Sequence, residues 1–160
     1  MEPVERRAPA GEGGAGDGRP VHRWPVRIYY EDTDHGGVVY HANYLRYMER
    51  ARTELLRAAG VELDEVERRW GVLFAVTRIA IDYRAPARFN DLLTVCSRLA
   101  RPTGVRIRYH QRIERADDGL CLSEAQVDLA CIARSGRPRR IPPALLQRLC
   151  AVADLRGGGR

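Results

Sequence analysis

The stretch Tyr30–Tyr44, which reads YEDTDHGGVVYHANY, decides the fold of this chain. It joins a short alternating segment to a long amphipathic one, and it holds three acids, two histidines and the pair Gly36-Gly37. Adjacent glycines let a backbone turn sharply or approach a ligand closely. The stretch therefore predicts a strand, a tight turn and a helix, with acidic side chains beside the amides that open the helix. An acid next to an anion-stabilising amide suits acyl-transfer chemistry.

The flanking residues extend these elements. Residues 26–30 alternate in the way that is typical of a short strand. Asn43 is suited to cap a helix, and Gly60 is suited to end it in a left-handed turn. The spacing thus predicts a helix over residues 43–59. Its apolar face would consist of Tyr44, Met48, Ala51 and Leu55.

The second half of the chain predicts strands. Four segments carry apolar residues at or near a period of two: 73–83, 91–100, 105–115 and 121–131. Asp118-Gly119 predicts the turn of a hairpin, and Pro142-Pro143 predicts the start of a short helix. The order is strand, long helix, four strands and short helix. It predicts a two-layer α+β domain in which an antiparallel sheet wraps around the long helix.

Length and composition indicate one domain between two extensions. A chain of 160 residues is long enough to bury a core. Residues 1–23 are rich in glycine, have no net charge and lack the apolar segment of a secretory signal, so they predict a disordered extension. The domain is expected over residues 24–153, with a flexible tail at 154–160. No apolar run approaches the roughly 20 residues that span a bilayer, so a cytoplasmic location is expected.

The positive charge is concentrated at the C-terminal end. The net charge is +6, there is no lysine, and residues 134–160 hold seven arginines against one acid. One interpretation is a solvated basic tail. The other is a docking surface for a phosphorylated substrate or an acidic carrier protein, since the planar arginine fork suits phosphate. Nucleic acid is not expected, because the segment lacks interleaved aromatic residues.

Metal and nucleotide sites are not expected either. The four cysteines form no C-x-x-C pair, and they predict reduced thiols. His35, His41 and Glu49 follow no metal-ligand spacing. Gly11, Gly13 and Gly16 match G-x-G-x-x-G, but neither a strand nor a helix flanks them, so the match is compositional.

Three segments carry a family resemblance. Residues 30–52, YEDTDHGGVVYHANYLRYMERAR, closely resemble the acyl-CoA thioesterases of the 4-hydroxybenzoyl-CoA thioesterase type, above all the bacterial branch associated with the Tol-Pal envelope system. Residues 82–87 and 136–142 are also similar to that family. The resemblance covers about residues 25–150. It implies the hotdog fold, hydrolysis of acyl-CoA without a cofactor, and homodimers or homotetramers with active sites at subunit interfaces.

The resemblance also implies roles for individual residues. The family's catalytic acid falls on Asp34, as general base or as nucleophile. Its oxyanion donor falls on the backbone N–H of His41, and the side chains of Tyr30 and His41 fall on positions associated with the site. The charge distribution, and not the resemblance, predicts the contacts for the CoA phosphates: Arg137, Arg139 and Arg140 follow the last strand and carry much of the positive excess, with Arg84 and Arg88 next.

Simpler interpretations stand beside these roles. Asp34 could be only a turn residue, Tyr30 only strand packing and His41 only a half-buried polar residue, while Asp32 is expected to cap or position the turn. Two other functions stay open. One is a hotdog hydratase or dehydratase, which needs a His–acid pair; the other is a non-catalytic module that binds acyl carrier protein or an envelope partner. The sequence leaves the acyl chain length open.

Overall fold

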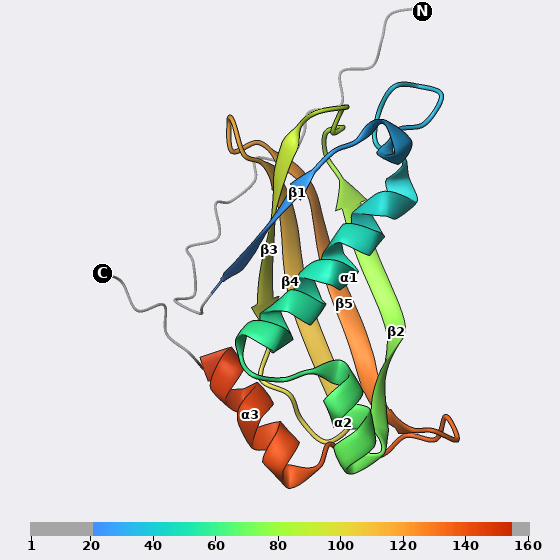
Figure 1. Ribbon diagram of the computed structural model, residues 1–160, viewed down its shortest axis with the longest axis vertical. Helices are drawn as coiled ribbons and strands as arrows, with labels where there is room; N and C mark the ends of the chain where they lie inside the picture. Colours follow the sequence, from blue (N-terminus) through green and yellow to red (C-terminus); the bar gives the residue numbers. More distant parts are fainter. Residues whose placement is uncertain (1–20, 155–160) are drawn as a thin grey trace, which may run out of the picture.

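The computed structural model describes residues 21–154, in which one long helix crosses a face of a five-stranded antiparallel sheet (Figure 1). This confirms the predicted α+β fold. The elements are β1 (His22–Arg27), a 3₁₀ helix (Tyr30–Asp32), α1 (His41–Ala58), α2 (Leu63–Trp70), β2 (Val72–Tyr83), β3 (Leu92–Leu99), β4 (Arg106–Arg115), β5 (Cys121–Ala133) and α3 (Pro143–Asp154).

The strand order in the sheet is β1-β3-β4-β5-β2, so β1 and β2 form the two edges. Central β4 keeps the predicted period of two: Ile107, Tyr109, Gln111 and Ile113 are buried, while the intervening arginines and His110 are exposed. α1 lies diagonally across the inner face of the sheet, and α2 and α3 lie at one end of it (Figure 1). In the described sheet, β1 pairs only with β3, and β2 pairs only with β5.

Helix α1 was predicted nearly at its observed bounds. Tyr44, Met48, Ala51 and Leu55 are all buried, as the spacing predicts. The helix begins at His41, so the prediction that Asn43 caps it is wrong. The Asn43 amide instead donates a hydrogen bond to the Asp32 carbonyl at 2.9 Å. Because the Asn43 side chain binds the carbonyl of the preceding turn and not an amide of the helix, Asn43 lies inside the first turn of the helix.

The first strand lies earlier than predicted. It starts at His22, inside the stretch predicted as disordered, and it ends at Arg27. Tyr30 therefore belongs to a 3₁₀ turn and not to a strand. The reason is local, because the Asp32 carboxylate accepts the N–H of Tyr29 at 2.7 Å and folds the chain back. Residues 1–20 and 155–160, which hold the rest of the predicted extension and tail, lie outside the described residues.

One element was missed. α2 follows the long helix directly, with acids in its first turn and arginines in its last, and it ends at left-handed Gly71. These are helix start and stop signals, but eight residues contain too few apolar repeats to predict a helix by periodicity. The predicted short C-terminal helix is confirmed as α3, with Leu145 and Leu149 buried.

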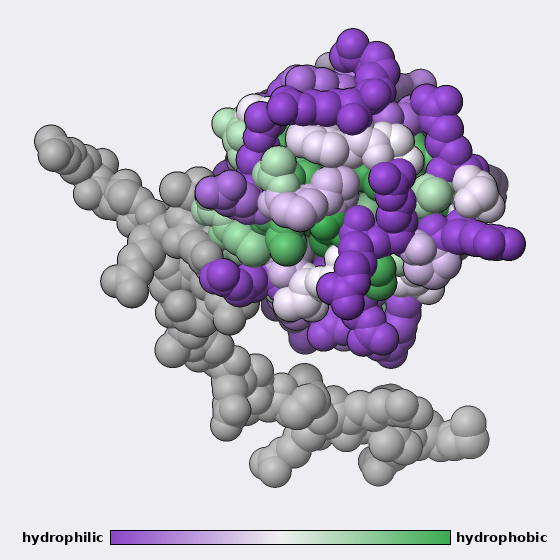
Figure 2. Space-filling view, turned by 90° about the horizontal axis from the view of Figure 1, so that it is seen from below, coloured by the Kyte–Doolittle hydropathy of each residue, from purple (hydrophilic) through white to green (hydrophobic). Residues whose placement is uncertain are grey.

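The core consists of two clusters, one at each end of α1. The first gathers around the start of α1 and includes Ile28, Val39 and Tyr44. The second lies under α2 and α3 and includes Val66 and Leu145. Hydrophobic side chains are visible among hydrophilic ones from the α2–α3 end of the molecule (Figure 2). No helix within residues 21–154 is long and apolar enough to span a membrane.

Candidate active site

The loop that precedes α1, residues 33–40, is held closed by its own backbone. Thr33 and Val39 form an antiparallel bridge. The N–H of Asp34 donates to the Val38 carbonyl at 2.9 Å, and the N–H of Gly37 donates to the Asp34 carbonyl at 3.0 Å. Gly37 has φ +76°, a conformation that favours glycine. We call this segment the Asp34 loop.

The Asp34 side chain lies on the surface at the tip of the loop. Its Oδ1 accepts the N–H of Gly36 at 2.8 Å. A Cβ atom on Gly36 would lie 3.1 Å from that oxygen, so a side chain there would push against the carboxylate. The other carboxylate oxygen has no partner among residues 21–154. The loop thus presents one oriented acid to the solvent.

The start of α1 follows the Asp34 loop directly. His41 is the first helical residue, and its N–H has no hydrogen-bond partner within the described part of the chain. Free amides at a helix N-terminus attract negative charge. The Asp32 carbonyl accepts the N–H of Tyr40 at 3.0 Å and the Asn43 side chain at 2.9 Å. Asp32 therefore positions the helix start, which fits its predicted role.

Aromatic rings surround His41. Its imidazole lies 4.6 Å from the Tyr40 ring and 6.3 Å from the Tyr83 ring, between centroids. The Tyr83 hydroxyl also donates to the His41 carbonyl at 2.8 Å. Partial burial raises the pKa of Tyr83, so the hydroxyl stays a donor at neutral pH. Sequence reasoning missed Tyr83 as a site residue, because it lies 42 residues away at the end of β2.

Tyr30 is placed differently. Its side chain is 82% exposed, and its ring meets the edge of Phe89 at 6.3 Å between centroids. No contact joins it to Asp34 or His41 among the interactions of the described residues. Of the three predicted catalytic residues, Asp34 lies on the loop and His41 begins the helix that follows it, while Tyr30 lies against Phe89.

The predicted phosphate contacts lie far from the Asp34 loop in the same chain. Arg137, Arg139 and Arg140 are exposed and follow β5, at the end of β2 opposite Tyr83 (Figure 1). Arg88 is nearer, because it forms a backbone bridge with Val38 of the Asp34 loop. Arg84 forms an ion pair with Glu124 at 2.6 Å. Of the five arginines named as phosphate contacts, Arg88 is therefore the one that lies beside the loop within the described residues of one copy.

The cysteines and acids form no metal site in the described residues. No group of three His, Cys, Asp or Glu side chains between residues 21 and 154 could hold an ion. The four cysteines are free thiols, as predicted, and burial raises the pKa of Cys131 and Cys96.

Residues 29–149 match the model of the Thioesterase-like superfamily. The chain belongs to that superfamily. The match includes the Asp34 loop, α1 and the whole sheet except β1, so the predicted family is confirmed over most of the described residues.

Individual relatives agree with this thioesterase assignment. The chain is 42% identical over 129 residues to the acyl-CoA thioester hydrolase YbgC of Escherichia coli O6:H1, covering 79% of this chain and 93% of that protein. It is 45% identical over 109 residues to the acyl-CoA thioesterase YbgC of Haemophilus influenzae, and the match covers 68% of this chain and 79% of that protein. The crystal structure of a probable thioesterase from Bartonella henselae superimposes with a TM-score of 0.71 at 36% identity. The match covers 77% of this chain and 100% of that chain. The fold is the predicted hotdog fold.

Proposed function

We propose that this chain hydrolyses acyl-CoA thioesters to the free acid and CoA. The observation that supports the proposal is the exposed Asp34 carboxylate on a closed loop that leads directly into the unpartnered N–H of His41 at the start of α1. Relatives that share 42–45% of their residues with this chain carry the name of acyl-CoA thioesterase.

The helix start supplies the electrostatic part of the mechanism. The thioester carbonyl oxygen accepts the N–H of His41, where the helix dipole favours the negative charge that develops on it. A donor already fixed in place costs no reorganisation when the reaction occurs. Tyr83 and Asp32 act as positioning residues, because they hold the carbonyl of His41 and the turn before it.

Asp34 supplies the chemical part. As general base, it takes a proton from water while the oxygen of that water attacks the carbonyl carbon and the C–S bond breaks. As nucleophile, it forms an acyl-aspartate anhydride, which water then cleaves. In both routes the electron pair of the C–S bond leaves with sulfur. The thiolate leaves without prior protonation, because a thiol is a much stronger acid than an alcohol. The free carboxylate oxygen suits either role.

The proposed active unit is a homodimer formed along β2, and two such dimers would form a tetramer. β2 pairs only with β5 in the described sheet, and it exposes Val76, Ile79 and Tyr83 by 47%, 38% and 46%. An unpaired apolar edge strand needs a partner. A two-fold axis across β2 would place the Tyr83 end of one copy beside the Val72 end of the other. That arrangement supports a site completed by both chains.

The same arrangement supports the phosphate assignment. Arg137, Arg139 and Arg140 follow β5 where it pairs with Val72. In an antiparallel β2 pair, they lie near the Asp34 loop of the second copy, where they bind the phosphates of CoA. An acyl carrier protein is a second candidate partner for this basic surface. The proposed location is the cytoplasm, where the four thiols stay reduced.

Release of free thiol from acyl-CoAs of graded chain length tests the proposal. Hydrolysis of at least one of them, abolished by Asp34→Asn, supports it. Hydration of an enoyl-CoA without thiol release would instead indicate the hydratase alternative, but the imidazole of His41 has no carboxylate partner within residues 21–154. Binding of acyl-CoA without turnover would indicate a non-catalytic module.

A further inference from the structure

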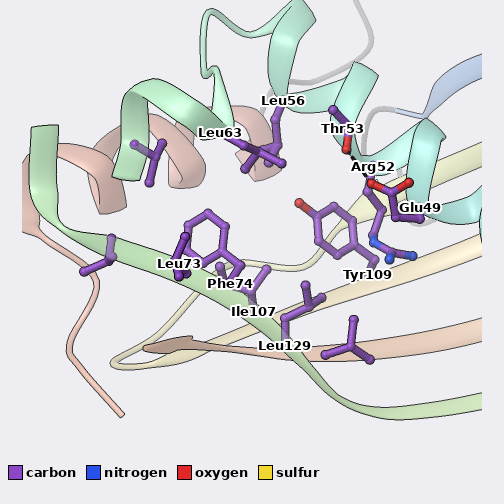
Figure 3. Close-up of a pocket in the computed structure, with 13 residues that line it drawn as sticks. Glu49, Arg52, Thr53, Leu56, Leu63, Leu73, Phe74, Ile107, Tyr109 and Leu129 are labelled. Atoms are coloured by element: carbon purple, nitrogen blue, oxygen red, sulfur yellow. Dashed lines mark hydrogen bonds between the residues drawn. The ribbon is translucent and has the colours of Figure 1, made fainter. Parts of the chain in front are cut away.

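A cavity of about 220 Å³ lies between α1, α2 and the sheet, at the end of α1 far from the Asp34 loop (Figure 3). Most of its wall is apolar, with Leu56 from α1, Leu63 from α2, Phe74 from β2, Ile107 from β4 and Leu129 from β5. An apolar protein cavity of about 150 Å³ accepts benzene, so this one accepts about nine non-hydrogen atoms. The volume therefore suits a short acyl group or a single substituted ring.

One polar group points into this cavity without a partner. Tyr109 lies on the inner face of β4 and is 2% exposed. Its hydroxyl has no hydrogen-bond partner within residues 21–154, and it points into the space between Leu63 and Phe74 (Figure 3). Burial raises the pKa of Tyr109, so the hydroxyl stays protonated. The oxygen is not among the fully buried unpaired polar atoms of the described residues, so it lies at the cavity surface, where it can donate to an oxygen of a bound molecule.

A fixed cation stands behind the Tyr109 ring. The guanidinium of Arg52, itself 8% exposed, lies 5.9 Å from the ring centroid and donates to the Gln111 side chain at 2.9 Å. The Gln111 amide donates in turn to Ser97 at 2.8 Å and to the Met48 carbonyl at 2.9 Å. This chain of hydrogen bonds fixes the guanidinium at the cavity wall.

No acid neutralises that cation directly. Arg52 forms no ion pair within 4.0 Å among the described residues. Glu49 also lines the cavity, and its carboxylate accepts the Thr53 hydroxyl at 3.0 Å. Glu49 also acts electrostatically on Arg52, so the two charges oppose each other at this wall, and the Tyr109 hydroxyl is the group that favours an oxygen over a plain methyl group.

We infer that the cavity binds the far end of a short acyl group, of about six to nine non-hydrogen atoms, which ends in an oxygen that accepts a hydrogen bond from Tyr109. Tyr109 and Arg52 would thus determine acyl specificity. This inference rests on the proposed thioesterase function. It names the substrate class as short acyl-CoAs with a hydroxyl, ether or carbonyl oxygen at the far end.

The cavity serves the Asp34 loop of a second copy. His41 and Arg52 are eleven residues apart on α1, which is about 16 Å along a helix axis and too far for a short acyl group. β2 runs from Phe74 at the cavity to Tyr83 at the loop. Antiparallel pairing of two β2 strands therefore brings the loop of one copy to the cavity of the other.

Two isosteric substrates test the role of Tyr109. 6-Hydroxyhexanoyl-CoA and heptanoyl-CoA differ only in a terminal hydroxyl in place of a methyl group. The ratio of interest is kcat/KM for 6-hydroxyhexanoyl-CoA divided by kcat/KM for heptanoyl-CoA. We expect this ratio to fall about tenfold in Tyr109→Phe relative to wild type, because one hydrogen bond is lost. The Phe variant keeps the ring against Arg52, so its stability should not fall. An unchanged ratio in a folded variant would overturn the inference.

A second variant tests occupancy of the cavity. Leu63 is 37% exposed at the cavity wall, so Leu63→Trp fills the space with little risk to folding. We expect it to lower kcat/KM for heptanoyl-CoA about tenfold or more and to leave acetyl-CoA within about twofold. Leu120→Trp, on the exposed β4–β5 hairpin, is the matched control. Equal losses for both substrates would contradict the inference.

Binding without turnover separates this inference from the proposed function. Phenol and toluene have nearly the same shape and differ in the hydroxyl. We expect phenol to raise the melting temperature of the wild-type protein more than toluene does, and Tyr109→Phe to remove the difference. Equal shifts in the wild type would overturn the cavity assignment even if acyl-CoA is hydrolysed. The expected shifts without any thiol release would contradict the thioesterase proposal alone.

Discussion

The residues gathered at the two ends of α1 come from different kinds of segment: one continuous stretch at the start, and several separate elements at the other end. The Asp34 loop and the helix start come from one continuous segment, residues 29–43, which is closed by backbone hydrogen bonds and exposed to solvent. The cavity at the other end takes its wall from two helices and three strands, and its Tyr109 and Arg52 side chains are buried. Between them, the Arg52–Gln111–Ser97 hydrogen bonds separate the two hydrophobic clusters. A reactive acid can be positioned locally, whereas a recognition pocket needs the assembled sheet.

If the chemistry is confined to the loop end, one substitution there should remove it. We expect Asp34→Asn to lower kcat/KM about 1,000-fold, within the range of general base catalysis. The free energy of unfolding should change by less than about 0.5 kcal/mol, because the side chain is exposed. Thiol release and thermal denaturation measure the two quantities. Asp117→Asn, in an exposed turn, is the control, and wild-type activity in the Asp34 variant would refute the mechanism.

The two ends cooperate only if a second copy joins them. A lysine in place of Ile79 puts a charge on the exposed edge of β2 and should prevent pairing. We expect the variant to sediment as a monomer and to lose at least about tenfold in activity per chain. Dilution of the wild type should have the same effect once dimers dissociate. Leu120→Lys is the matched control, and a fully active monomer would show that one chain completes its own site.

The two ends of α1 also offer different arginines to the CoA phosphates. Replacing Arg137, Arg139 and Arg140 together by alanine should raise KM about tenfold and change kcat little, because three exposed charge contacts are worth about 1.4 kcal/mol together. The effect should shrink with added salt. If the KM of the triple variant stays the same and that of Arg88→Ala rises, the phosphates bind at the loop end of the same chain.

The smallest effect is expected from the hydrogen bond that ties β2 to the helix start. Tyr83→Phe removes the donor to the His41 carbonyl. We expect kcat to fall by about two- to tenfold with KM unchanged, because the oxyanion donor loses its fixed position. Tyr40→Phe alters a ring beside the same imidazole and is the control. A change in KM alone would assign Tyr83 to substrate binding instead.

The sequence alone determined the elements whose signals are local. The four-residue spacing of α1 and the period of two in β4 depend only on neighbours along the chain. The same holds for the Asp34 loop, where Gly36, Gly37 and Asp32 act within a few residues. This is why the fold class and the position of Asp34 were predicted from the sequence. The errors are local as well: Asp32 converted the end of the predicted strand into a 3₁₀ turn, and α2 was too short to show a period.

Only the tertiary structure decided what lies around that loop. Tyr83 reaches His41 across 42 residues, and Arg52 reaches Gln111 across 59. Neither contact has a signal in the sequence, because Tyr83 and Gln111 each fit the alternation of an ordinary strand. The cavity is likewise a property of how α1, α2 and the sheet pack, not of any one of them. Local patterns fix which elements form, and burial of their apolar faces against one another then decides which distant side chains meet.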